Sequence, residues 1–152
     1  MTRPIRFARA LGLALLATSL LTSGAGAQGR SPADARIIDG YRLTMPMLRK
    51  VLPALYAPGA QSCPRDRRDP RTLGIAEMAQ MVDRCAPMVQ ALRRAGVPSR
   101  EAALVMASLY RTAEAVAIRR GDASAVDPGP LRDNALLMQQ NDSEIKRLTG
   151  ED

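Results

Sequence analysis

The sequence predicts an all-α fold, a compact bundle of four to five helices around a central apolar helix, with one disulfide. Apolar residues recur in several segments at the three- and four-residue spacing of an amphipathic helix, and no segment alternates with the period of a strand. From Ala102 to Tyr110 no side chain is charged, which is typical of a helix surrounded by other helices. The two cysteines of the chain complete the prediction, because they are expected to pair.

Residues 1–27 have the features of a secretory signal peptide. Arginines precede an apolar run from Ala10 to Leu21, and Ala25-Gly26-Ala27 supplies the small-x-small pattern that signal peptidase reads. The alternative, a membrane anchor that stays attached, is disfavoured because a bilayer span needs about 20 apolar residues. We therefore expect Sec-type export, cleavage after Ala27, and a mature chain that is periplasmic or secreted and not transmembrane.

The chain that remains after cleavage has the length of one domain. Residues 28–40 contain glycine and proline and little apolar content, so they are expected to form a flexible lead-in. Residues 41–149 are expected to form a single α-helical domain, and residues 150–152 a short tail.

The first expected helix runs from about Thr44 to Tyr56. Its apolar residues follow helical spacing, and Pro46 suits the first turn. Pro53 lies inside the pattern and is expected to kink or shorten the helix. A loop over 60–71 follows, after which Thr72 is placed to cap a second helix that Pro87 breaks or bends.

The central helix is expected from Ser99 to about Arg120. It follows a continuation of the second helix that stops at Gly96, a residue type common at helix C-termini. Residues 121–130, rich in proline and glycine, form a stiff connection. The last helix is expected from about Leu131 to Leu148, with its apolar residues on one face.

The predicted export determines how Cys63 and Cys85 are interpreted. In an oxidising compartment an isolated pair is most simply a structural disulfide, and no CxxC redox motif is present. Closing this loop would stabilise a small domain by about 3 kcal/mol on the chain-entropy model. Free thiols or an intermolecular bridge remain as alternatives.

Composition excludes several classes of protein. The chain has no histidine, so it cannot hold a Ser-His-Asp triad, an imidazole-ligated zinc or a CxxCH-attached haem, and we expect no cofactor and no metal. It has no tryptophan, one phenylalanine and three tyrosines, which leaves few aromatic platforms for stacked bases. A nucleic-acid partner is therefore not expected.

Three groups of residues are candidate sites. An arginine loop between two prolines has the side chains to bind an anionic envelope component, although its aspartates favour a merely solvated loop. A polar pocket between the last two expected helices is the second candidate, against the simpler reading of caps and inter-helix hydrogen bonds. Methionines invite a copper(I) interpretation, but their helical spacing favours packing. The arginine loop comprises Arg65, Arg67, Arg68 and Arg71, and the polar pocket comprises Tyr110, Glu114, Asn134, Asn141 and Glu144.

Three segments carry a resemblance to a known group of proteins. They are Tyr41-Arg42-Leu43-Thr44-Met45, the stretch from Ala95-Gly96-Val97 to Arg100-Glu101, and the stretch from Asn134 to Glu144-Ile145. On these segments the chain resembles small exported bacterial helical proteins with no assigned activity. In that family a Ser or Thr cap precedes Pro, Arg and Glu in a capping box, whereas residues 98–101 read Pro-Ser-Arg-Glu here. The resemblance implies a helical fold and export.

The function expected from these observations is that of a binding or adaptor module of the bacterial cell envelope, without catalysis. Its partner would be an envelope protein or an anionic envelope component. The alternative is a small enzyme or sensor that uses carboxylate and tyrosine groups in an inter-helix pocket. A third class, a structural or stress protein without a ligand, stays open.

Overall fold

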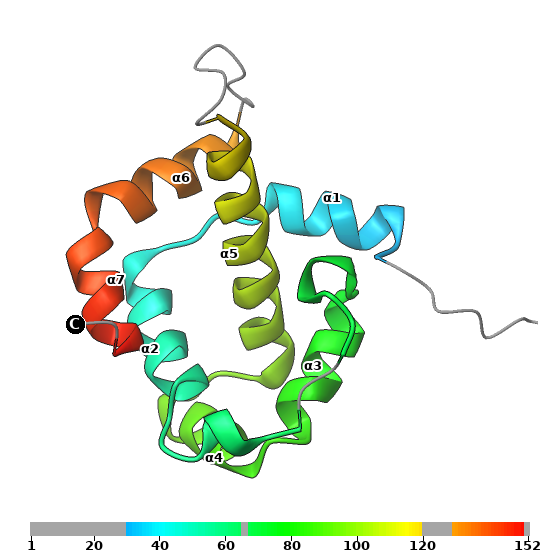
Figure 1. The fold of residues 1–152 in the computed structure, drawn as a ribbon, viewed down its shortest axis with the longest axis vertical. Helices are drawn as coiled ribbons and strands as arrows, with labels where there is room; N and C mark the ends of the chain where they lie inside the picture. The colour runs from blue at the N-terminus through cyan, green and yellow to red at the C-terminus, as the bar shows by residue number, and fades with distance from the viewer. Residues whose placement is uncertain (1–29, 65–66, 120–128, 151–152) are drawn as a thin grey trace, which may run out of the picture.

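The computed structural model describes residues 30–64, 67–119 and 129–150 of the 152-residue chain. These ranges contain seven α-helices, two short 3₁₀ helices and no strand, which confirms the all-α prediction (Figure 1). The signal peptide expected over 1–27, Arg65, residues 121–128 of the expected stiff connection, and the tail residues 151–152 lie outside the described residues. The elements are α1 Pro32–Gly40, α2 Met45–Leu55, η1 Ala60–Ser62, η2 Pro70–Thr72, α3 Ile75–Asp83, α4 Ala86–Ala95, α5 Ser99–Arg119, α6 Pro130–Gln140 and α7 Asp142–Thr149.

Helix α5 lies between the other helices and contacts α1, α2, α3, α4 and α6 (Figure 1). Small side chains let the neighbours approach it closely, since Ala102, Ala103 and Ala107 are fully buried. One hydrophobic cluster joins α5 to α2 and α4, and a second joins it to α1 and α3. None of the helices in the described ranges has the length and apolar character needed to span a bilayer.

The expected flexible lead-in over 28–40 is wrong for most of its length, because residues 32–40 form helix α1. Ser31 caps this helix by accepting a hydrogen bond from the Asp34 N–H at 3.0 Å, and Pro32 occupies its first turn. Ile38 is 1% exposed and packs in the second cluster. A short helix with one buried anchor therefore has too little apolar content to stand out in the sequence.

The structure contains more helices than the four to five expected, because α1 was not expected and two of the expected helices are each divided. Arg84 and Cys85 separate α3 from α4, and Asn141 separates α6 from α7. The Asn141 amide donates to the Leu137 carbonyl oxygen at 2.7 Å, which satisfies the end of α6 where the chain turns.

Helix α3 begins at Ile75 rather than directly after Thr72. The Asp69 carboxylate accepts a hydrogen bond from the Arg71 N–H, which holds Pro70–Thr72 in the 3₁₀ turn η2 instead. At the new start, the Glu77 carboxylate accepts from the Gly74 N–H at 2.9 Å. Asp34 of α1 accepts from the Ile75 N–H at 3.3 Å, so α1 also caps α3.

The segment 41–44, between α1 and α2, is held by side chains of α5 and α6. The Tyr41 hydroxyl donates to the Glu101 carboxylate of α5. The buried Asn134 of α6 donates to the Tyr41 carbonyl oxygen and accepts from the Leu43 N–H, both at 2.8 Å. Tyr41, Glu101 and Asn134 are far apart in the sequence and meet at this one junction.

Alkaline pH is expected to destabilise the protein through Tyr41. Burial and the Glu101 carboxylate raise the pKa of Tyr41, whereas in the unfolded chain a tyrosine ionises near pH 10. The stabilisation is therefore complete below about pH 10 and declines above it, because only the unfolded state then gains from losing the proton. Urea unfolding of the wild type and of Tyr41→Phe should show a stability difference that shrinks above this pH. A constant difference from neutral to strongly alkaline pH would contradict the assignment.

Candidate ligand cavity

An open cavity of about 700 Å³ lies among the helices. Every α-helix of the described chain except α1 contributes to its wall. One apolar residue from each of these helices, in chain order, is Leu55, Met81, Met88, Met106, Met138 and Ile145. The wall is thus assembled from residues far apart in the sequence.

The wall is apolar and rich in methionine. Its four methionines are half-buried, in contrast to the fully buried Met78 of the core. Methionine is unbranched and polarisable, so it adapts its side chain to apolar partners of different shapes. Four methionines, whose helical spacing predicted packing, therefore lie at a cavity surface in the folded chain.

Two of the three tyrosines of the chain lie in the cavity wall. Tyr56 and Tyr110 are 44% and 41% exposed, which is high for large apolar side chains. Gln61 and Thr149 add an amide and a hydroxyl. A tyrosine ring offers an apolar face and a hydrogen-bonding tip, so these residues suit the boundary between an apolar ligand and water.

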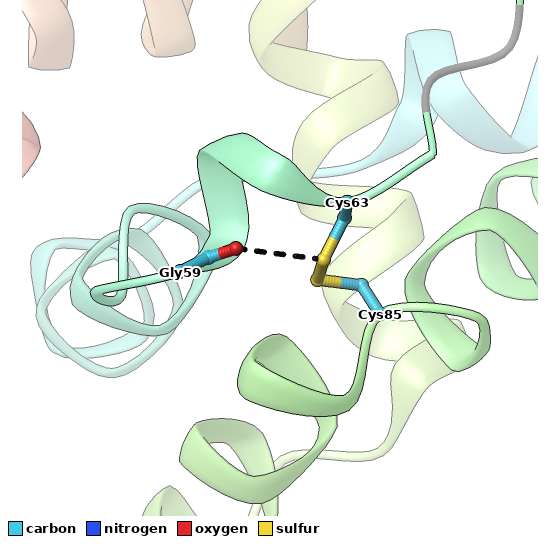
Figure 2. Close-up of a disulfide and its surroundings, with 3 residues drawn as sticks. All are labelled: Gly59, Cys63 and Cys85. Atoms are coloured by element: carbon cyan, nitrogen blue, oxygen red, sulfur yellow. Dashed lines mark hydrogen bonds between the residues drawn. A yellow bond between two sulfur atoms is a disulfide. The ribbon is translucent and has the colours of Figure 1, made fainter.

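The predicted disulfide is present and forms part of the wall. Cys63, at the end of η1, is bonded to Cys85, which precedes α4, with a Cα–Cα distance of 5.4 Å (Figure 2). The Gly59 carbonyl oxygen lies 3.8 Å from Cys63 Sγ, a packing contact because a disulfide sulfur carries no proton. Gly59 has a φ of 86°, and a Cβ there would lie 3.3 Å from Pro87, so the turn packs closely on the start of α4.

The arginine loop begins and ends at this cavity. Pro64 and Pro70 both line the wall, and Arg67 and Arg68 lie in the segment between them. Arg68 forms an ion pair with Glu77 of α3.

Arg71 and Asp69 form a second ion pair at the end of the loop. The Arg71 guanidinium donates to both Asp69 oxygens, at 2.6 to 3.0 Å. These hydrogen bonds hold the pKa of Asp69 below its usual range.

Most residues of the predicted polar pocket are not brought together. Tyr110 lines the apolar cavity, and Asn134 is buried at the junction of segment 41–44. Asn141 makes the local bond at the end of α6, as described above. Glu114 pairs with Arg111 at 3.5 Å.

Glu144 of α7 is engaged with α2. Two hydrogen bonds, at 2.7 and 3.1 Å, join its carboxylate to the Arg49 guanidinium. They lower the pKa of Glu144 and raise the pKa of Arg49. The pair therefore joins α7 to α2. This is a structural role, of the kind expected from the sequence as the simpler alternative to a polar pocket.

The described wall of the cavity is mostly apolar. No aspartate, glutamate, lysine or arginine is among the described residues that line the cavity. Within the described ranges, no group of three or more His, Cys, Asp and Glu residues is placed to hold a metal ion. The arrangement is therefore suited to surround an apolar molecule.

Sequence reasoning did not find this cavity, because its wall combines six helices and two loops. The sequence offered only a compositional signal for the cavity, because two of the three tyrosines and four methionines lie in its wall. Comparisons of the chain with protein-family models, with curated proteins and with solved structures find no match.

Proposed function

We propose that the chain is an exported binding protein of the bacterial cell envelope that holds an apolar small molecule in the cavity and catalyses no reaction. The observation that carries this proposal is the open cavity of about 700 Å³ with an apolar wall and two exposed tyrosines. Small-molecule sites occupy roughly 300–1,000 Å³ and combine apolar walls with a few polar groups. The cavity has this size and this composition.

Export is consistent with a protein that binds an apolar molecule. A structural disulfide is typical of secreted and periplasmic proteins, and the leader over 1–27 has the pattern of a signal peptide. An apolar molecule is poorly soluble between membranes or outside the cell, so a protein there can keep it in solution by burying it. The alternative of an enzyme or sensor has less support, because Glu114 and Glu144 are paired with arginines and are not among the described residues that line the cavity.

Nile red, an uncharged dye whose emission shifts to the blue in apolar surroundings, tests the proposal. The exported protein should have the intact mass of a chain that begins at Gln28. We expect it to bind one dye molecule and to shift the emission of the dye to the blue. Ala113 is exposed and lines the cavity, so Ala113→Trp should leave folding unchanged and obstruct the cavity. The expected result is dye binding about tenfold weaker, equivalent to about 1.4 kcal/mol.

Ala33→Trp is the matched control. Ala33 is an exposed alanine of α1, the helix that contributes nothing to the cavity wall. This variant should bind Nile red as the wild type does. Equal weakening in both variants, or no saturable binding by the wild type, would refute the proposal.

A further inference from the structure

We infer that the ligand is a single-chain amphiphile with an anionic head group, whose chain lies in the methionine-rich cavity and whose head group is bound by Arg67. This inference rests on the proposed function and adds the chemical class of the ligand. Its carrying observation is that Pro64 and Pro70, which lie three residues to either side of the exposed Arg67, both line the apolar cavity.

The position of Arg67 follows from the length of the chain. Pro64 and Pro70, three residues before and after it, both line the cavity wall. Three residues span at most about 11 Å when fully extended, so the Arg67 Cα lies within that distance of the wall on both sides. An arginine side chain is long enough to bring its guanidinium to a head group at the cavity edge.

The ion pairs of the loop leave Arg67 available. Arg68 is paired with Glu77, and Arg71 is paired with Asp69. Arg67 is exposed and has no ion-pair partner within the ranges that the structure describes. An incoming carboxylate or phosphate therefore need not displace a protein carboxylate from this guanidinium.

Both ends of the loop are fastened to the protein. The Cys63–Cys85 disulfide fixes the beginning. At the other end, the Arg30 backbone N–H donates to the Thr72 carbonyl oxygen at 2.6 Å, and the Arg30 side chain donates to the Leu73 carbonyl oxygen at 3.3 Å. Arg67 is thus presented from a loop with fixed ends, which lowers the entropy cost of ordering it on a ligand.

The composition of the cavity wall restricts where a ligand's charge can lie. A charged head group inside the cavity would have no charged partner and would lose its hydration. At the edge it keeps water and meets arginine, which binds carboxylate and phosphate oxygens in pairs. A cationic head group would be repelled there, and a neutral one would form no ion pair with Arg67.

Three probes with the same alkyl chain test this inference: dodecanoate, dodecanol and dodecylammonium. Binding is measured by calorimetry on the exported protein at neutral pH and low ionic strength, below the concentrations at which the probes form micelles. We expect dodecanoate to bind about fivefold more tightly than dodecanol, as for an exposed ion pair, and dodecylammonium to bind most weakly. Added salt should reduce the advantage of dodecanoate.

Arg67→Gln should abolish the preference for dodecanoate and leave dodecanol binding unchanged. Arg36→Gln is the control, because Arg36 is an exposed arginine of α1, away from the cavity, and its removal changes the net charge equally. Equal binding of dodecanoate and dodecanol by the wild type would overturn the inference and leave the proposed function standing. Binding of none of the probes would overturn both, as would retention on anionic phospholipid vesicles without any binding of the single-chain probes.

Discussion

Removal of the Cys63–Cys85 disulfide should lower the free energy of unfolding by about 3 kcal/mol. The bridge closes a loop between residues 22 apart in the sequence, and the chain-entropy model assigns about this amount to a loop of that length. For a domain of this size the melting temperature should fall by roughly 10 °C. The loss is large because a small domain has only about 5–15 kcal/mol of net stability.

The paired variant Cys63→Ala and Cys85→Ala is the suitable test. Cys85 is 1% exposed, so serine at this position would add a buried hydroxyl to the effect of losing the bond. Denaturant unfolding of this variant should match that of the reduced wild type, and both should be less stable than the oxidised wild type. Equal stability of the oxidised and reduced wild type would show that the bridge does not constrain the unfolded chain.

Loss of the disulfide should also weaken ligand binding in the cavity. Both half-cystines line the wall, and the bridge holds η1 against the start of α4. The reduced protein should therefore bind Nile red more weakly than the oxidised protein under conditions where both remain folded. A pure effect on the unfolded state would leave dye binding unchanged, so this measurement separates the two roles of the bridge.

The disulfide and the long helices could be predicted because their signals are local. The uncharged run around Ala102–Tyr110 falls within α5, and the apolar spacing near residue 50 falls within α2. Pairing of Cys63 with Cys85 needed only the choice of compartment, since no other cysteine is present in the chain.

Helix α1 could have been recognised from its cap but not from its hydrophobicity. Ser31-Pro32 followed by Asp34 is a start signal for a helix, with the cap residue, the first-turn proline and an early acidic residue in place. Its packing depends mainly on Ile38, and one buried residue gives no periodicity. A short helix stabilised by its cap and by one tertiary anchor therefore resembles a loop in the sequence.

The cavity could not be predicted because no single segment determines it. Met81 belongs to α3, Met106 to α5 and Met138 to α6, and only the fold brings them to one wall. The same holds for the arginine loop, whose charges were visible in the sequence while its place beside an apolar cavity was not. The proposed binding function therefore depends on tertiary placement rather than on a motif.

The role of Asn134 also depends on tertiary placement. Asn134→Ala should lower the free energy of unfolding by about 3 kcal/mol. The side chain is 1% exposed and bonds two backbone groups more than 90 residues away in the sequence, the Leu43 N–H and the Tyr41 carbonyl oxygen. Alanine would leave the buried Leu43 N–H and the partly buried Tyr41 carbonyl oxygen without this partner, and a buried unsatisfied group costs about 1–3 kcal/mol. Denaturant unfolding measures the loss directly.

Asn141→Ala is the matched control, and Asn134→Asp identifies the cause. Asn141 makes a local bond to Leu137, so its loss should cost under about 1 kcal/mol. In Asn134→Asp, an ionised carboxylate still accepts from the Leu43 N–H but faces the Tyr41 carbonyl oxygen, whereas the protonated acid regains a donor. The folded-state pKa of the new carboxyl group should therefore be raised, so the variant should become more stable relative to wild type as pH falls. A loss of stability independent of pH would assign the effect to packing rather than to the hydrogen bond with Tyr41.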